Sequence, residues 1–200
     1  MPPNQCLERR RRGAAFLAAG RGQLTPAALR TLLRDHYDGG TVHHVRPFDD
    51  PFFFSICMHA DPLDNTTASM VASLPATPDR PAAIGVSLGS PCVGAFVPVW
   101  LEAPVPAALA RGGGEPDDDS PWWRMRALLD LVERDVATYG PMVRARWNRF
   151  EAGVWRDAAG VERDAARCEG PARSALLGDF SAQVVERWLA ELAAVVLAIR

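Results

Sequence analysis

The sequence predicts an α+β fold, in which an antiparallel meander of strands is flanked along the chain by helices. Segments 1–40 and 120–200 have the three- and four-residue spacing of apolar side chains that is typical of helices, whereas segment 41–101 alternates with a period of two. Connections within 41–101 are short, which favours antiparallel pairing over parallel crossovers. The length of 200 residues and the hydrophobic content of 48% fit a single domain spanning 1–200.

The N-terminal segment predicts two helices. The first spans 4–19 and has a modest apolar content. The second begins at Thr25-Pro26, where a capping residue is followed by proline at the first helical position. It is expected to end at Gly39-Gly40, because glycine is the preferred residue just beyond a helix C-terminus.

The middle segment predicts four strands separated by turns that are rich in Asp, Asn and Pro. They span 52–59, 66–74, 82–88 and 92–100. Strand 66–74 alternates between an apolar face that contains Met70 and a hydroxylated face that contains Thr67 and Ser69. From composition alone, we expect the hydroxylated face to be the hydrated one.

The C-terminal part predicts a loop followed by helices. Segment 102–119 is rich in Pro and Gly and then acidic, which is typical of a surface loop. Ser120-Pro121 begins an amphipathic helix, and Gly140-Pro141 interrupts its apolar stripe. We therefore expect a long broken helix or a helical hairpin, an irregular stretch near 167–174, and a last helix over 180–199.

Charge and composition exclude several classes of function. All 22 basic residues are arginine. The 200 residues therefore offer no lysine for a Walker-type phosphate loop or a pyridoxal Schiff base. A net charge of −2 predicts no basic surface for nucleic acid, and the run Arg9–Arg12 covers all sides of a helix. The longest apolar tract, 189–199, is too short to span a bilayer and contains Glu191. We expect neither a nucleic-acid partner nor a membrane.

The cysteine pattern predicts reduced thiols. Cys6, Cys57, Cys92 and Cys168 are far apart in the sequence and form no CxxC pair. Nothing in this spacing predicts a disulfide framework or a zinc site, so no metal ligand is expected. No signal peptide is visible after Met1, and the predicted location is the cytoplasm.

The polar row at the start of strand 66–74 is the candidate substrate site. Asn65, Thr66, Thr67 and Ser69 place amide and hydroxyl groups beside a turn, where such groups can orient a substrate amide or carbonyl. A strand that faces water explains the same row without any function. His59 ends the preceding strand and is assigned an orienting role, with an ordinary hydrogen-bonded strand-end residue as the alternative.

Five regions of the sequence together carry a resemblance to a known family. They are Leu32-Leu33-Arg34-Asp35-His36-Tyr37, then Ser55-Ile56-Cys57-Met58-His59-Ala60 with Thr66-Thr67-Ala68-Ser69-Met70-Val71-Ala72, then Gly89-Ser90-Pro91-Cys92-Val93, Phe96-Val97-Pro98 and Ser120-Pro121-Trp122-Trp123. In this order they resemble the C-terminal half of the secernin and bacterial dipeptidase family, which are cysteine hydrolases of the N-terminal-nucleophile class. The likeness extends from about Arg9 to the C-terminus, and the shared order makes it more specific than any single region.

The resemblance implies an αββα sandwich, in which two stacked antiparallel sheets lie between helical layers, and it implies amide-bond hydrolysis. The family nucleophile is a cysteine at the start of the mature chain with its own α-amino group as base, so no metal or organic cofactor is implied. The segment bearing that cysteine has no counterpart here, and none of the four cysteines opens a strand with its α-amino group free. A weaker candidate is Gly40-Thr41, which resembles the cleavage point of other N-terminal-nucleophile hydrolases.

No catalytic residue is therefore assigned in this chain. We interpret it as the C-terminal portion of a dipeptidase-like amide hydrolase that is inactive alone and takes a small peptide or amide substrate when an N-terminal half completes it. Its incomplete sheet predicts association with itself or with a partner chain. The alternative is a non-catalytic association or binding module built on a truncated hydrolase scaffold.

Overall fold

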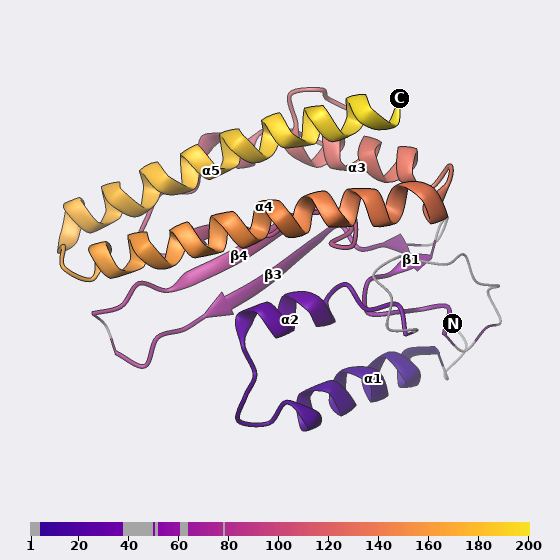
Figure 1. Cartoon of the computed structure of the whole chain (residues 1–200), viewed down its shortest axis with the longest axis horizontal. Helices are drawn as coiled ribbons and strands as arrows, with labels where there is room; N and C mark the ends of the chain where they lie inside the picture. The colour runs from indigo at the N-terminus through magenta and orange to yellow at the C-terminus, as the bar shows by residue number, and fades with distance from the viewer. Residues whose placement is uncertain (1–4, 38–49, 51, 61–63, 78) are drawn as a thin grey trace.

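Two long helices and a three-stranded sheet dominate the molecule (Figure 1). The computed structural model describes residues 5–37, 50, 52–60, 64–77 and 79–200. Helices α4 (Val136–Ala165) and α5 (Gly170–Ile199) have 30 residues each, about 45 Å at 1.5 Å per residue. They pack against each other and cover one face of the sheet, so the predicted α+β class is confirmed.

The N-terminal part forms two helices, α1 (Gln5–Ala19) and α2 (Pro26–Leu32). The predicted cap is confirmed, because the Thr25 hydroxyl accepts a hydrogen bond from the backbone N–H of Ala28 at 3.1 Å. The predicted end at Gly39-Gly40 is wrong, since α2 stops at Leu32. Both glycines and Thr41 lie outside the described residues.

The main sheet is an antiparallel meander in the order β3-β4-β5, as predicted. Its strands are β3 (Ala68–Ser73), β4 (Ala83–Leu88) and β5 (Val97–Trp100). A second, two-stranded sheet pairs β1 (His59–Ala60) with β2 (Asp64–Asn65) in antiparallel fashion. The register of this small sheet places His59 opposite Asn65.

Two of the predicted strands are corrected by the structure. Residues 52–58 form turns and bends instead of a strand, because the Asp50 carboxylate accepts the backbone N–H of Phe52 at 2.7 Å. The strand expected over 92–100 begins only at Val97, because residues 90–94 form a tight turn. Local side-chain bonding of this kind competes with strand ladders.

The apolar face of β3 is exposed, contrary to the prediction, with Met70 64% exposed. On the hydroxylated face Thr67 and Ser73 are exposed as predicted, whereas Ser69 is half-buried and Val71 is buried. The cause is the tertiary packing of α2 and α4 onto the Ser69 side. A Cβ on Gly85, the cross-strand partner of Val71, would lie 3.1 Å from the Trp155 ring of α4.

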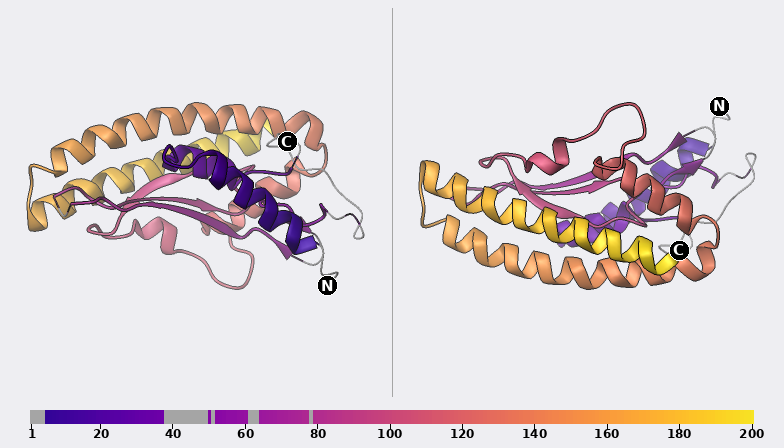
Figure 2. Two further views of the ribbon diagram at one scale, coloured as in Figure 1. Left: turned by 90° about the horizontal axis from the view of Figure 1, so that it is seen from below. Right: turned by 90° about the horizontal axis from the view of Figure 1, so that it is seen from above.

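The C-terminal helices begin with α3 (Pro121–Val132), which is capped by Ser120 as predicted. The predicted interruption is present but lies earlier than Gly140-Pro141, because the Asp135 carboxylate caps α4 and that helix continues through Pro141. The irregular stretch is short, and α5 begins already at Gly170. The segment between β5 and α3 contains the short helix η1 (Ala107–Ala110), which contacts α5, and lies on the side of the sheet opposite α4 (Figure 2).

The hydrophobic core lies between α3, α4, α5 and the region around β5. Its largest fully buried side chains include Trp147, Trp188, Phe96 and Met125. Within the described residues, none of the helices combines the length and the apolar composition that a bilayer crossing requires.

Candidate functional site

Four side chains with metal-ligating atoms meet in the interior, near the end of α2 and the start of β1. They are His36, Cys57, His59 and Cys92, and their ligand atoms all lie within 4.8 Å of one another. Cys57 is inaccessible to solvent, and only 5% of the His59 side chain is exposed. We call this group the sulfur–imidazole cluster.

His36 is held in the cluster by the bonds of its neighbour Asp35. Arg12 of α1 donates to both carboxylate oxygens of Asp35, with distances of 3.1, 3.1 and 2.6 Å. The same carboxylate accepts the backbone N–H of Tyr37 at 2.8 Å, and Tyr37 has a φ of 78°, which is uncommon for a residue other than glycine. The chain therefore turns sharply after α2, and His36 is buried at that turn.

Cys57 and His59 reach the cluster from one short segment. The backbone N–H of Cys57 donates to the carbonyl of Asp35 at 3.2 Å, and the carbonyl of Cys57 accepts from the Ser55 hydroxyl at 2.6 Å. The bend at Cys57 precedes β1 and brings the Cys57 sulfur to 3.5 Å from Nε2 of His59.

Cys92 lies in the turn that follows β4. The N–H groups of Val93 and Gly94 donate to the carbonyls of Ser90 and Pro91 at 3.1 and 3.3 Å. A Cβ on Gly94 would approach the Ser87 hydroxyl to 2.6 Å, so this tight turn has no room for a side chain there. In this position the Cys92 sulfur is 3.2 Å from Nε2 of His59.

A second buried group holds the same turn from its backbone side. Arg34 pairs with Glu151, whose carboxylate also accepts the N–H of Phe96 at 2.9 Å. Arg144 Nη1 donates to three carbonyl oxygens of the turn, those of Pro91 at 3.1 Å, Cys92 at 3.3 Å and Gly94 at 2.8 Å. Burial, followed by the charge of Arg34, lowers the pKa of Arg144 to about 10. We call Arg34, Arg144 and Glu151 the guanidinium cluster.

Protonation differs sharply between the two thiols of the sulfur–imidazole cluster. Burial raises the pKa of Cys57 well above its usual value, and its hydrogen bond to Cys92 acts in the same direction. Burial also opposes ionisation of Cys92, yet the hydrogen bond from Cys57 and the charge of His59 hold the pKa of Cys92 well below its usual value. The two shifts therefore favour the neutral thiol at Cys57 and the ionised form at Cys92.

The pKa of His59 is shifted towards its charged form by its neighbours. Burial alone lowers the pKa of His59, but the Cys92 thiolate and the Glu133 carboxylate raise it to about 9. Oε1 of Glu133 lies 3.6 Å from Nδ1 of His59, so Glu133 faces one ring nitrogen while Cys92 and Cys57 face the other.

This arrangement can hold a metal ion or share protons between sulfur and imidazole. The order Cys92, His59, Glu133 also has the sulfur, imidazole and carboxylate of a cysteine hydrolase. A nucleophile must reach its substrate, however, and Cys92 is only 3% exposed. Attack by this sulfur on a substrate at the surface is therefore not supported by the geometry.

The predicted substrate-binding residues lie beside the cluster, in different surroundings. The Thr66 hydroxyl accepts from the N–H of Met58 at 2.9 Å, and the Thr66 carbonyl accepts from the Ser90 hydroxyl at 3.2 Å, so Thr66 joins the two cysteine-bearing segments. Asn65 and Ser69 are half-buried and Thr67 is exposed. Their contact with a substrate stays a prediction, and His59 is a member of the cluster.

Sequence reasoning missed the meeting of His36, Cys57 and Cys92. Spacing motifs for zinc detect ligands that share one hairpin or helix, whereas these ligands come from three segments of irregular chain. The signal that was present is the pair Cys57-x-His59, which places a sulfur and an imidazole on one side of an extended segment.

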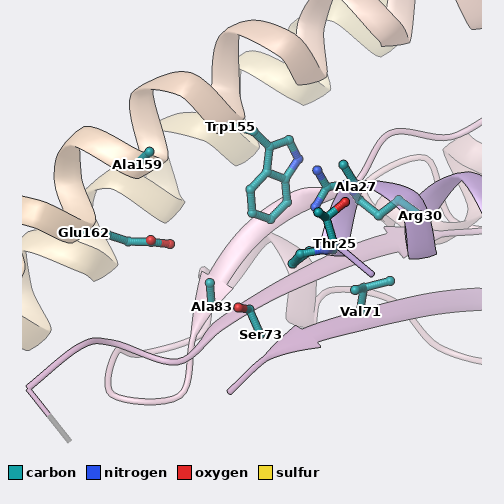
Figure 3. A pocket seen from close by; sticks show the side chains of 10 residues that line it. Thr25, Ala27, Arg30, Val71, Ser73, Ala83, Trp155, Ala159 and Glu162 are labelled. Carbon is teal, nitrogen blue, oxygen red and sulfur yellow. The ribbon is translucent and has the colours of Figure 1, made fainter. Parts of the chain in front are cut away.

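A separate pocket of about 260 Å³ lies between α2, α4 and the β3–β4 edge (Figure 3). The guanidinium carbon of Arg30 is 4.1 Å from the centre of the Trp155 ring, and both side chains line the pocket together with Glu162. The strand residues that line it are Val71, Ser73 and Ala83. The predicted row at Asn65–Ser69 does not line this pocket.

Comparison of the sequence with protein-family models and with curated proteins gave no match.

Proposed function

We propose that this chain forms the sheet-and-helix portion of a dipeptidase-like amide hydrolase whose cysteine nucleophile lies outside these 200 residues. The observation that carries the proposal is that regions far apart in the sequence lie together in the structure. The regions that resemble the secernin and bacterial dipeptidase family are dispersed over the first 123 residues of the sequence. In the structure they contact one another directly, and three of them supply the side chains of the sulfur–imidazole cluster.

The bonds connect every one of these regions. The first region contacts three others, through Asp35 O to Cys57 N at 3.2 Å, Arg34 Nε to Pro91 O at 2.9 Å, and the Arg34 guanidinium over the Phe96 ring at 4.8 Å. The last region is attached by Trp122, whose indole N–H donates to the carbonyl of Thr67 at 2.8 Å. If these residues belong to one site, that shared site accounts for the concentration of the likeness in short regions.

The uncovered part of the sheet supports the sandwich that the resemblance implies. Cross-strand pairing places Met70, Val86 and Val97 on one face, which is apolar across all three strands. Near β3 this face is open, with Met70 64% and Leu74 74% exposed. In an αββα fold the second sheet packs on such a face, and it would also carry the nucleophile.

Within a completed enzyme, the polar row beside the cluster would orient the scissile amide. Asn65 and Thr67 offer an amide and a hydroxyl group that can donate to a developing oxyanion, a role worth roughly 3–4 kcal/mol in the transition state. Thr66 holds the two segments together, and the buried His59 orients rather than acts as a base. We place this chemistry in the cytoplasm, where thiols stay reduced.

The test is to supply the missing segment. The chain is assayed for hydrolysis of unblocked dipeptides alone and as a fusion to the cysteine-led N-terminal half of a family dipeptidase. We expect background rates for the chain alone and turnover for the fusion, abolished when the supplied cysteine is replaced by alanine. A fusion that unfolds cooperatively and yet lacks activity would contradict the proposal, as would turnover by the chain alone with contaminating peptidases excluded.

The polar row is tested in the active fusion. Thr67→Val and Asn65→Ala are each expected to lower kcat by tenfold or more, about 1.4 kcal/mol in activation free energy. Thr77→Val, at an exposed position on the loop after β3, is the matched control and should leave kcat unchanged. Near-normal turnover in both test variants would make the row scaffold and its assignment wrong.

A second candidate is a non-catalytic association module, and one observation favours it. The apolar side chains of Met70, Leu74, Leu101 and Val105 are each more than 60% exposed, and a partner that covers exposed apolar side chains is stabilised by burying them. Sedimentation velocity discriminates the two functions. A stable complex of this chain with itself or a partner, in a fusion that never hydrolyses a dipeptide, would favour association.

A further inference from the structure

We infer that His36, Cys57, His59 and Cys92 bind one zinc ion, as a closed structural site that joins three separate segments of the chain. The inference is independent of the proposed hydrolase function, since it concerns only the four side chains and their immediate neighbours. Neither the sequence spacing nor the family resemblance implies such a site.

The interatomic distances suit a tetrahedral ion. Zn–S bonds of about 2.3 Å and Zn–N bonds of about 2.0–2.1 Å give ligand–ligand separations of about 3.8 Å for S–S, 3.6 Å for S–N and 3.3 Å for N–N. The Cys57 sulfur is 3.5 Å from Nε2 of His59, and the Cys92 sulfur is 3.2 Å from the same nitrogen. No pair of ligand atoms exceeds 4.8 Å, so binding requires side-chain shifts on the order of 1 Å at most.

The four ligand types favour zinc over Mg²⁺ and Ca²⁺. Two thiolate sulfurs and two imidazole nitrogens form the Cys₂His₂ combination of structural zinc sites, whereas Mg²⁺ and Ca²⁺ require oxygen ligands. All four residues are at least nine-tenths buried as side chains or as whole residues, which leaves no open coordination position for a substrate. A full set of four protein ligands is typical of a structural site rather than a catalytic one.

The surroundings are those that a metal site needs. Glu133 faces Nδ1 of His59 at 3.6 Å, and a carboxylate on the second ring nitrogen orients a histidine whose Nε2 ligates the metal. The backbone of each cysteine is also fixed, that of Cys57 by Asp35 and Ser55 and that of Cys92 by Arg144. The ligands are therefore positioned before an ion arrives.

The rings of His36 and His59 complete the geometry. Their centres are 5.4 Å apart and their planes are inclined by 49°, so they are adjacent without being stacked. Two imidazoles that ligate one ion approach it along different directions, as this inclination allows. An ion here would link the end of α2 to the turn after β4, in addition to the bond from Arg34 to the carbonyl of Pro91.

The experiment uses the whole chain, purified with a chelator and reduced. One equivalent of Zn²⁺ or Co²⁺ is added, excess metal is removed, and bound metal is measured by plasma mass spectrometry. We expect about one ion per chain, and for Co²⁺ the visible bands of a tetrahedral ion with a thiolate-to-cobalt charge-transfer band. The cobalt spectrum reports sulfur ligation in the unsubstituted chain, so the result does not depend on whether variants fold.

Matched cysteine variants locate the site. Cys57→Ser and Cys92→Ser should each lose stoichiometric zinc, whereas Cys6→Ser and Cys168→Ser should keep it, because both of those thiols lie outside the cluster. Glu133→Gln retains all four ligands and should weaken zinc binding by about 10- to 100-fold, the usual effect of removing a carboxylate that orients a ligand histidine.

Three results would overturn the inference. The first is a reduced, folded chain that retains no metal after reconstitution. The second is zinc that survives Cys57→Ser and Cys92→Ser but disappears with Cys6→Ser or Cys168→Ser. The third is a Co²⁺ complex without the charge-transfer band, which would mean that sulfur is not a ligand. None of these results depends on dipeptide hydrolysis, so the zinc site and the proposed function can fail separately.

Discussion

The guanidinium cluster and the sulfur–imidazole cluster fasten the same turn, residues 90–94, in different ways. Arg144 and Arg34 hold its carbonyl oxygens with charged N–H donors, and Glu151 balances their charge inside the protein. The other cluster reaches the turn only through the Cys92 side chain and gathers two sulfur atoms and two imidazoles around one point. The guanidinium cluster therefore consists of N–H donors and the carboxylate that is paired with them, whereas the sulfur–imidazole cluster brings together side chains of the types that ligate zinc.

The largest expected effect comes from breaking the balance of the guanidinium cluster. Glu151→Ala leaves two buried guanidinium groups without their carboxylate and should lower the free energy of unfolding by about 3–5 kcal/mol. Glu191→Ala breaks the more exposed pair with Arg146 and should cost about 0–1 kcal/mol. Urea denaturation measures both. Equal losses would show that the guanidinium cluster does not stabilise the turn.

The next effect concerns the sulfur–imidazole cluster, because an ion that binds only the folded chain stabilises it. At free zinc one hundred times the dissociation constant, the gain is about 2.7 kcal/mol. The midpoint of thermal unfolding should therefore rise with Zn²⁺ and fall again with a chelator, in the unsubstituted chain and in Cys168→Ser. In Cys57→Ser neither addition should move it. A midpoint that is insensitive to zinc in all three proteins would contradict this prediction.

The helix caps could be predicted because they depend on neighbouring residues. Thr25-Pro26 and Ser120-Pro121 specify their helix starts through a hydroxyl and a missing N–H within one turn, and the structure confirms both. Strand periods were likewise recognised for β3 and β4, since alternation is a local property.

The features that the sequence does not predict depend on residues far away along the chain. Alternation shows that β3 has two faces but not which one α2 and α4 cover, so the exposures of Met70 and Ser69 were reversed. The sulfur–imidazole cluster requires turns at Asp35–Tyr37 and at residues 90–94, and both turns are set by long-range bonds from Arg12 and Arg144. Nothing in the spacing of His36 and Cys92 records those bonds.

The smallest expected effect concerns Glu162, a half-buried carboxylate that forms no ion pair with an arginine among the described residues, in contrast to Glu151. Burial raises the pKa of Glu162, which lines the pocket in Figure 3. A raised pKa means that the fold favours the protonated acid, so the stability from this residue is complete below about pH 4.5 and is lost as the pH rises through its folded pKa.

Glu162→Gln removes that loss. The variant should gain stability relative to the unsubstituted chain between pH 4 and pH 7, by less than about 0.5 kcal/mol because the side chain is half-exposed. Denaturant titrations at both pH values measure the difference. A variant that is less stable at pH 7 than at pH 4, relative to the unsubstituted chain, would contradict the sign.

The ion pair between Arg34 and Glu151 can form only late during synthesis of the chain. The two residues are 117 positions apart, and at about 5–20 residues per second a ribosome needs roughly 6–23 s to add the residues between them. During that interval Arg34 has been synthesised and Glu151 has not, so the turn that carries Cys92 lacks one of its anchors. Cys57 and Cys92 are both made within the interval, and their thiols are open to oxidants and metal ions of the cell before the core closes over them.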